Sequence, residues 1–278
     1  MDAPTVKKQI AWQPLTARGV AAFASAALGR LLLVQFVIAL LASATVVWFL
    51  HRAWYPVIDE AVAQLPEQGE IVYGRLEWRG KSPILLAEGH FLAFSVDLEH
   101  RGGARSPAQV QVEFGRTDVQ VSSLFGFERI AYPLTLAVGF NHIEVGPWWG
   151  AWAPALLGIV AGLVIVGLMA TWAILATAYC WIVWLVASGA NRRLTWRGSW
   201  RLAGAALMPG ALLLTGAIIS YGLGAMDFLK FALVVVAHFV VGWIYLVLCP
   251  LSLPQTAVEV VPANPFGMPP SPLDSTKK

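Results

Sequence analysis

The hydrophobic pattern of this chain consists of long apolar runs and one region in which apolar and polar residues alternate. The longest run, residues 148–186, contains no charged residue. Apolar stretches of about 10–14 residues are usual for buried helices of soluble proteins, whereas about 18 or more without charge indicate a membrane span. A second uncharged run, residues 31–50, would cover about 30 Å as a helix, which is the thickness of the hydrocarbon core. The pattern therefore predicts an integral membrane protein.

Two further apolar runs follow toward the C-terminus. The first is rich in small residues and contains Pro209, and residues 225–227 make a short turn before the next run. Pro250 and Pro254 end the last run, because proline disfavours a helical conformation of the residue before it. We expect four transmembrane helices, over residues 31–50, 147–188, 202–224 and 228–250.

The length of the second run leaves open whether it forms one helix or several. As one helix, residues 148–186 would extend for about 58 Å, nearly twice the hydrocarbon thickness. The stretch from Trp152 to Trp181 would cover about 43 Å, which matches the distance between the two aromatic belts of a bilayer. A pair of packed spans would need a polar turn, and the run has none. We favour a single long helix.

The alternating region, residues 51–146, is expected to form a small β-rich domain. Its short apolar segments are separated by glycine, proline and acidic residues, a spacing typical of an antiparallel sheet with one apolar face. A helix over residues 57–65, ended by Pro66, is expected to cover that face. The strand candidates are residues 71–78, 84–88, 91–96, 110–114, 119–121, 125–131 and 134–145.

The two ends of the chain have patterns of their own. Residues 1–30 place apolar side chains at roughly helical spacing with Arg18 off that face, which predicts an amphipathic helix on the cytoplasmic membrane surface. A soluble helical lead-in is the alternative. Residues 251–278 are rich in proline and predict a disordered cytoplasmic tail. Pro269 and Pro272 have the spacing of a PxxP ligand, although a flexible tether is the commoner role of such a tail.

Composition and charge indicate which side of the membrane each part of the chain faces. The chain is 58% hydrophobic and 13% charged, which excludes an ordinary soluble domain. Residues 189–201 form the most basic short loop, whereas residues 52–146 hold twelve acidic and eight basic residues. Since basic short loops stay in the cytoplasm, the β-rich domain should lie outside the cell and both termini inside. The four arginines of the loop are Arg192, Arg193, Arg197 and Arg201.

The predicted fold class is thus a polytopic α-helical membrane protein with four spans and an inserted small β-rich (α+β) extracytoplasmic domain. The expected location is the bacterial cytoplasmic (inner) membrane, with residues 31–50 as an uncleaved signal anchor because no cleavage site follows them closely. The basic residues flank the spans and form no separate patch, so we expect no nucleic-acid partner. The expected partners are the lipid bilayer and a membrane protein, which could be a second copy of the chain.

Three stretches carry a resemblance to a known group of proteins: residues 66–79 (PEQGEIVYGRLEWR), 117–132 (TDVQVSSLFGFERIAY) and 194–213 (LTWRGSWRLAGAALMPGALL). With the order of the parts, they resemble a family of uncharacterised bacterial membrane proteins, a domain of unknown function. The third stretch is also similar to the basic loop and proline-containing span of Yip-type bundles. The resemblance implies an anchor span, an extracytoplasmic β-rich domain and a C-terminal helical bundle. It also implies a loose link to maltodextrin utilisation, but it points to no particular activity, because none is established for the family.

His238 is the candidate for intramembrane chemistry, because it lies near the middle of the fourth span. An ionisable group at this depth should face the bundle interior, where it either serves a proton or polar pathway or makes one interhelical hydrogen bond. Thr215 and Ser220 of the third span are the expected partners in such a polar site.

Small residues at four-residue spacing form two candidate packing faces. Gly158 and Gly162 are a GxxxG pair in the second span, and Gly216, Ser220 and Gly224 lie on one face of the third. Such spacing allows two helix backbones to approach closely. We expect packing within the bundle, with self-association as the alternative.

Catalytic and metal chemistry have no support in the sequence. His90, His100 and His142 lie near acidic residues, but their spacing does not make several ligands converge as a metal site requires. The chain has no phosphate-binding glycine loop and no nucleophile elbow, so we expect no catalytic residue, cofactor or metal. Cys180 and Cys249 lie in apolar runs, where packing is their usual role.

The predicted function is therefore a non-enzymatic membrane protein that displays an extracytoplasmic binding, sensing or scaffolding domain. The alternative is an accessory subunit or small carrier of a transport system, with His238 in the pathway.

Overall fold

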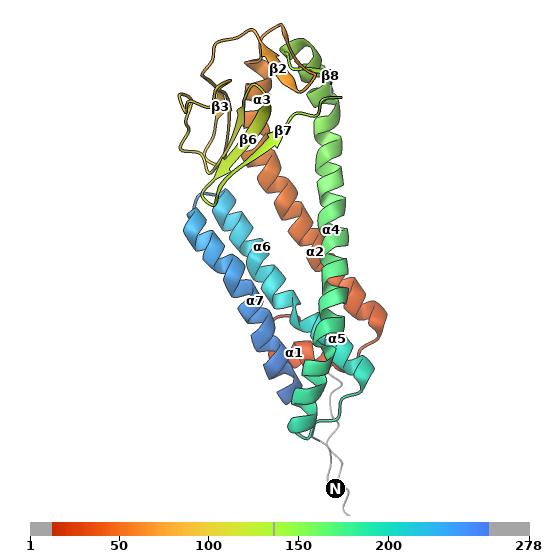
Figure 1. Ribbon diagram of the computed structural model, residues 1–278. Helices are drawn as coiled ribbons and strands as arrows, with labels where there is room; N and C mark the ends of the chain where they lie inside the picture. The colour runs from red at the N-terminus through yellow and green to blue at the C-terminus, as the bar shows by residue number, and fades with distance from the viewer. Residues whose placement is uncertain (1–12, 136, 256–278) are drawn as a thin grey trace, which may run out of the picture.

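The computed structural model describes residues 13–135 and 137–255 of the 278-residue chain. It is mixed α+β, with a β-rich domain at one end and long helices that extend from it (Figure 1). The described residues include four helical segments long and apolar enough to cross a membrane: Leu28–Ala63, His142–Gly189, Trp196–Gly222 and Phe228–Leu251. The predicted combination of four apolar helices and a β-rich domain is confirmed. The predicted disordered tail lies outside the described residues from residue 256 onward, as does the start of the N-terminal segment up to residue 12.

The described part of the N-terminal segment forms α1 (Ala17–Ala21) and the 3₁₀ helix η1 (Ala22–Ser25). Two short helices replace the single amphipathic helix expected here, and Val20 and Phe23 are fully buried in the helical bundle. The same apolar spacing that would suit lipid contact instead packs against other helices of the chain.

The first of the four candidate membrane spans contains α2 (Leu28–Ala53), and the helix breaks at Trp54 before α3 (Tyr55–Ala63). Proline in the first turn of α3 accounts for the break, because its ring cannot continue the preceding helix. Val57 and Ala61 of α3 are buried against the sheet, which confirms the helix expected to cover the apolar face.

The second span is one helix, α4 (His142–Gly189), of 48 residues. At about 1.5 Å per residue it is about 72 Å long, so it exceeds any bilayer. Its first turns belong to the β-rich domain: Trp149 Nε1 donates to Asp59 Oδ1 at 2.6 Å, and the Tyr55 hydroxyl donates to the Ala153 carbonyl oxygen at 2.9 Å. The expected strand over residues 134–145 is confirmed at residues 137–139 and wrong from residue 142 onward, where Asn141 caps the helix by accepting the Glu144 N–H at 2.9 Å.

The third candidate span consists of two helices instead of one, and it begins six residues earlier than predicted. Residues 196–201 are not loop but the start of α5 (Trp196–Ala206), because Thr195 caps the helix by accepting the Gly198 N–H at 3.1 Å. A second helix, α6 (Met208–Gly222), follows after a break at Leu207. Pro209 causes the break, since it has no N–H to donate to the preceding turn. The fourth span is α7 (Phe228–Leu251), close to its predicted range.

The β-rich domain contains two sheets in its described residues, a three-stranded one ordered β2-β1-β8 and a five-stranded one ordered β3-β4-β5-β6-β7. The expected single strand over residues 71–78 is a hairpin, because Tyr73 and Gly74 adopt positive φ angles of 50° and 74° in a tight turn. The bounds are β1 Gly69–Val72, β2 Arg75–Trp78, β3 Ile84–Glu88, β4 Leu92–Val96, β5 Val110–Phe114, β6 Asp118–Ser123, β7 Gly126–Ala131 and β8 Ala137–Gly139.

The larger sheet is mixed, not purely antiparallel as expected, because β4 and β5 run parallel. Directly paired residues share a face of a sheet, so the register separates two rows of side chains across β4 to β7. Val96, Phe114, Val119 and Ile130 form an apolar row on the face toward α3, and Ser95, Glu113, Gln120 and Arg129 form a polar row on the other.

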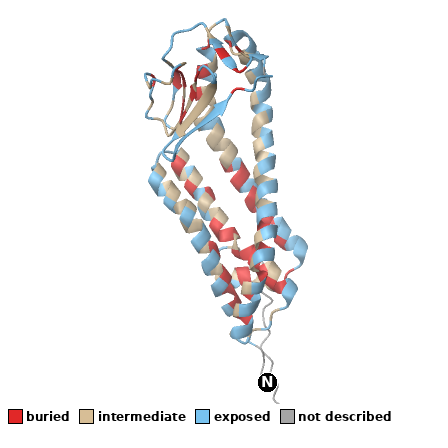
Figure 2. Cartoon of the chain, in the orientation of Figure 1, coloured by how far each residue is buried: buried red, intermediate tan, exposed pale blue. Residues whose placement is uncertain are grey.

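Burial follows the same division of the molecule. Buried residues concentrate in the β-rich domain and at the opposite end, around α5, η1 and the start of α2, while α4 and α7 carry long exposed faces (Figure 2). Those exposed faces are apolar, with only 11% of the most hydrophobic window of either helix buried. Such surfaces are suited to lipid and not to water.

Candidate functional site

The polar face of the larger sheet is covered by the connection between β4 and β5, residues 97–109, which we call the strap. Parallel strands need a crossover connection, usually a helix, and here the strap takes that role without one. The strap contacts the polar row of the sheet through side-chain hydrogen bonds, and these contacts bury Ser95 and Glu113 to 0% and 5% exposure. The sheet face that a sequence pattern would assign to water is therefore an interior.

Asp97 anchors the start of the strap. Its carboxylate accepts the N–H of Gly102 at 2.8 Å and the N–H groups of Glu99 and Gly103 at 3.3 Å each, and the residue is 2% exposed. Burial raises the pKa of this carboxyl, but the backbone donors, including that of Arg101, together hold it below its usual value. The ionised carboxylate of Asp97 thus stabilises the closed strap, in which the strap lies against the sheet.

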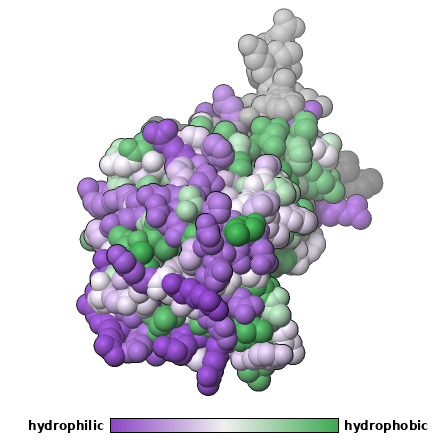
Figure 3. Space-filling model, turned by 90° about the horizontal axis from the view of Figure 1, so that it is seen from above, coloured by the Kyte–Doolittle hydropathy of each residue, from purple (hydrophilic) through white to green (hydrophobic). Residues whose placement is uncertain are grey.

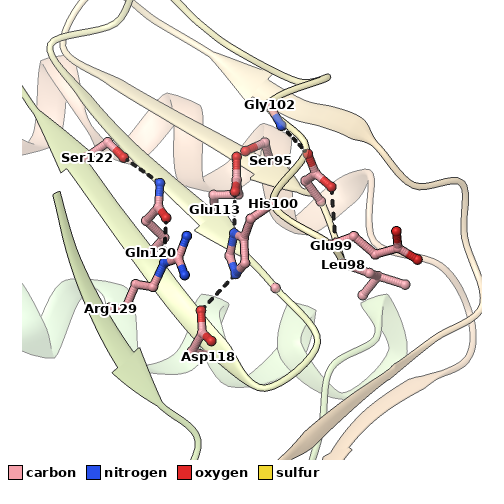
Figure 4. A network of polar contacts seen from close by, with 12 residues as sticks. Ser95, Leu98, Glu99, His100, Gly102, Glu113, Asp118, Gln120, Ser122 and Arg129 are labelled. Carbon is pink, nitrogen blue, oxygen red and sulfur yellow. Dashed lines mark hydrogen bonds and ion pairs between the residues drawn. The ribbon is translucent and has the colours of Figure 1, made fainter.

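His100 joins the strap to the sheet (Figure 4). Its Nδ1 lies 2.5 Å from Glu113 Oε1 and its Nε2 lies 2.8 Å from Asp118 Oδ1. Each ring nitrogen thus lies within hydrogen-bond distance of a carboxylate oxygen, so the ring links the strap to both β5 and β6. Gly115 makes room for the ring, because a Cβ there would lie 2.2 Å from Nε2.

Gln111 supplies a third attachment. Its Nε2 donates to Ser95 Oγ at 2.8 Å and to the Ala104 carbonyl oxygen at 2.7 Å, while its Oε1 accepts the Ser106 N–H at 3.1 Å. Both ends of the amide are therefore satisfied in a buried position. The strap is held by polar contacts at its beginning, middle and end.

A cavity of about 430 Å³ opens where the strap meets the helical bundle. Serine hydroxyls and glutamine amides supply its polar groups, and no charged side chain lines it among the described residues. The strap, β5, β6 and the turn after β6 contribute to its lining, together with the first residue of α7. The lining residues are Ser106, Pro107, Ala108, Gln109, Gln111, Ser122, Ser123, Leu124 and Phe228.

Aromatic side chains fix the domain against the ends of the helices beside this cavity. The ring centroid of Phe91, in the domain, lies 5.1 Å from that of Phe49 in α2 and 4.9 Å from that of Tyr221 in α6. Phe125, at the tip of the β6–β7 hairpin, lies 5.5 Å from Phe228 of α7. Edge-to-face pairs of this kind add stability beyond their buried area, so domain and bundle are coupled where the cavity lies.

The structure does not bring the predicted intramembrane polar site together. His238 Nδ1 contacts the carbonyl oxygen of Val235, the Thr215 hydroxyl donates to that of Ala211 at 2.8 Å, and the Ser220 hydroxyl donates to that of Gly216 at 3.0 Å. Each bond lies within its own helix, because a short polar side chain reaches the preceding turn more easily than a neighbouring helix. Interhelical bonds are made elsewhere: Gln35 donates to the Gly204 carbonyl oxygen at 3.2 Å, and the Ser43 hydroxyl donates to that of Ala161 at 3.1 Å.

The predicted packing glycines are not at helix contacts. No atom of another element lies within 4 Å of a Cβ built at Gly158, Gly162, Gly216 or Gly224, so the expected packing within the bundle is wrong for them. The close approach occurs at Gly210, where a Cβ would lie 2.5 Å from the His238 carbonyl oxygen. Spacing alone does not distinguish these positions, because it shows which residues share a face and not which face meets a partner.

The four predicted topology arginines gather at the end of the bundle opposite the β-rich domain (Figure 1). Arg192 donates to the Leu253 carbonyl oxygen at 2.5 Å, and Arg201 donates to that of Ala26. These two arginines therefore also connect segments of the chain at the end of the bundle. Arg193 and Arg197 are exposed.

Sequence reasoning missed the His100 network, because the partners of His100 are 13 and 18 residues away and not the neighbouring Glu99. In β5, Glu113 lies between the apolar residues Val112 and Phe114, and such alternation is typical of a strand with one solvated face. Across residues 13–135 and 137–255, no group of three or more His, Cys, Asp or Glu residues is arranged to hold a metal ion.

Acidification should loosen the strap. The folded-state pKa of Asp97 lies below its unfolded value of about 3.9. The stability from its backbone bonds is therefore complete above that value and is lost as the pH falls through the folded-state pKa. Hydrogen exchange at Gly102 and Gly103, corrected for intrinsic rates, should therefore accelerate as the pH falls below about 4. Asp97→Asn should exchange faster at the higher pH and show a flatter pH dependence; unchanged protection in this variant would contradict the role of the carboxylate.

No protein-family model, curated protein or solved structure matches this chain. The resemblance drawn from the three stretches stays a prediction.

Proposed function

We propose that this chain is a non-enzymatic protein of the bacterial cytoplasmic membrane that displays a binding domain on the outer surface, with the cavity beneath the strap as its ligand site. The supporting observation is the shared lining of that cavity, which joins the domain to Phe228 of α7. A ligand held there contacts domain and bundle at once. Binding outside can thus change how the domain sits on the helices, which is what a sensing or scaffolding role needs.

The lining favours a small neutral polar ligand. Ser122 and Ser123 offer hydroxyl donors, since their oxygens accept from Gln120 and Phe125, and Gln109 offers an amide. Leu124 and Phe228 add apolar contact. Groups that both donate and accept hydrogen bonds suit a ligand with several hydroxyls or amides. A strongly charged ligand would lose its hydration without gaining an opposite charge.

The orientation is supported by the two ends of the molecule. Seen from the end that carries the domain, hydrophilic residues cover most of the face, with apolar ones scattered among them (Figure 3). Leu124 and Phe125, at the tip of the β6–β7 hairpin, are 75% and 82% exposed and lie level with the start of α7. Apolar side chains at that level enter the lipid interface, which steadies the domain on the membrane. The arginines at the opposite end belong on the cytoplasmic side.

The test uses Ser123, which is exposed and lines the cavity. In a chain with Cys180 and Cys249 replaced by alanine, a single cysteine at Ser123 should react with a membrane-impermeant maleimide in intact cells. The bulky adduct should fill the cavity and reproduce the phenotype of cells that lack the protein. The matched control is Arg193→Cys in the same background, which should stay unlabelled until the cells are opened.

Two outcomes would overturn this function. Equal labelling of the two cysteines would contradict the orientation, and full labelling at residue 123 with no loss of the phenotype would contradict the ligand site. The transport alternative makes the opposite prediction at His238, where leucine should abolish the phenotype. Under the proposal His238→Leu leaves it intact, because the ring contacts the Val235 carbonyl oxygen and the Phe239 ring, both within its own helix.

A further inference from the structure

A second cavity, of about 530 Å³, lies at the basic end of the bundle, far from the strap. It is lined by two arginines, two tryptophans and one leucine: Leu28, Trp196, Arg197, Trp200 and Arg201. Four of these five residues come from the first two turns of α5. Trp196 and Trp200, and likewise Arg197 and Arg201, are four residues apart, so each pair projects from one side of the helix.

The aromatic walls of this cavity are held in place by the surrounding helices. Trp200 Nε1 donates to the Thr177 hydroxyl of α4 at 3.0 Å. The Trp196 ring meets the Trp184 ring of α4 edge to face, with 6.5 Å between centroids. The cavity is therefore formed before any ligand arrives, which lowers the entropy cost of binding.

The charges of this cavity are not neutralised within the described chain. Arg201 donates to the Ala26 carbonyl oxygen and keeps further guanidinium donors, since a guanidinium has five. The Arg197 side chain is exposed and forms no hydrogen bond or ion pair with another described residue. Residues 13–58 and 145–226 contain no aspartate or glutamate. The cavity thus presents two fixed positive charges beside apolar walls.

We propose that this cavity binds the phosphate of an anionic phospholipid headgroup. The planar donors of Arg197 and Arg201 fit the oxygens of a phosphodiester. Leu28 and the two indoles give the apolar contact that the glycerol and upper acyl chains need, and tryptophan favours this depth of a bilayer. A free phosphate ion would use the arginines and leave those walls without a partner. The site goes beyond the proposed outer binding domain and does not depend on it.

The test is lipid binding by the purified full chain in mild detergent, followed by native mass spectrometry. Phosphatidylglycerol should remain bound to the wild-type protein, and phosphatidylcholine with the same acyl chains should be lost first. Arg197→Gln should weaken phosphatidylglycerol binding about tenfold, because one charge-assisted contact is removed. Arg193→Gln is the matched control: it removes the same charge from an exposed arginine that does not line the cavity, and it should change binding less than about twofold.

Three results would overturn the site. An equal loss in both variants would mean that the basic end attracts lipid diffusely, without a defined cavity. Equal retention of the two lipids would mean that the headgroup is not recognised. Displacement of phosphatidylglycerol by millimolar inorganic phosphate would identify a soluble anion as the ligand. Unchanged thermal unfolding of Arg197→Gln would show that a loss of binding does not come from misfolding.

Discussion

Replacing His100 with leucine should destabilise the closed strap by about 3–5 kcal/mol, because it leaves the buried Glu113 carboxyl without its His100 partner. The strap carries exposed arginines at positions 101 and 105, which are trypsin sites. Cleavage there should become roughly a hundredfold faster or more, since each 1.4 kcal/mol of opening free energy is about a factor of ten in the open population. Native-state proteolysis of the full chain in detergent measures this rate.

Two companion variants separate loss of the ion pair from loss of packing. Adding Glu113→Gln to His100→Leu should recover part of the lost protection, because a neutral amide is less costly to bury than an unpaired carboxylate. His142→Leu changes an exposed histidine of the same domain and should leave the cleavage rate unchanged. If His100→Leu and His142→Leu cleave alike, the buried network does not hold the strap.

Gly210→Ala should destabilise the helical bundle by about 1–3 kcal/mol or more, because the added Cβ would lie 2.5 Å from the His238 carbonyl oxygen. The obstacle is backbone, so no side-chain rotation relieves it. The helices α6 and α7 must move apart to accept one methyl group. Thermal unfolding of the full chain in detergent should show a lower midpoint.

Gly216→Ala is the matched control, since it places the same methyl group on the same helix. Nothing from another element lies within 4 Å of that position. Alanine should therefore be neutral or stabilise the helix by up to about 1 kcal/mol, because alanine has the higher helix propensity. Opposite signs for the two variants are the expected result. If Gly216→Ala destabilises the protein and Gly210→Ala does not, the close helix contact lies at Gly216 and not at Gly210.

The contrast between Gly210 and Gly216 shows where sequence reasoning about helices ends. Small residues at four-residue spacing mark a face on which close approach is possible. The turn at Leu207 and the position of α7 determine that the approach takes place at Gly210, six residues earlier on the same helix. The predicted pairing of His238 with Thr215 and Ser220 is wrong for the same reason: the rotation of each helix about its axis decides which side chains meet.

The strands show a similar limit. The strand candidates over residues 84–88 and 110–114 match β3 and β5, since alternation is a local property of the chain. The parallel pairing of β4 with β5 is not local, and the strap that follows from it converts a polar strand face into an interior. Gln111 and Glu113 alternate with apolar residues along β5, as solvated residues do, but the strap buries both.

The sequence by itself determined the four apolar helices, the β-rich domain between the first two and the basic end opposite to it. Length, period and charge decide these features, and each acts within one segment or across the whole membrane. Only the tertiary structure decided that His100 lies between Glu113 and Asp118, that Gly210 meets the backbone of His238, and that two cavities form at opposite ends of the bundle. These contacts join residues distant in the chain, and their geometry depends on strand register and helix rotation, which no local pattern specifies.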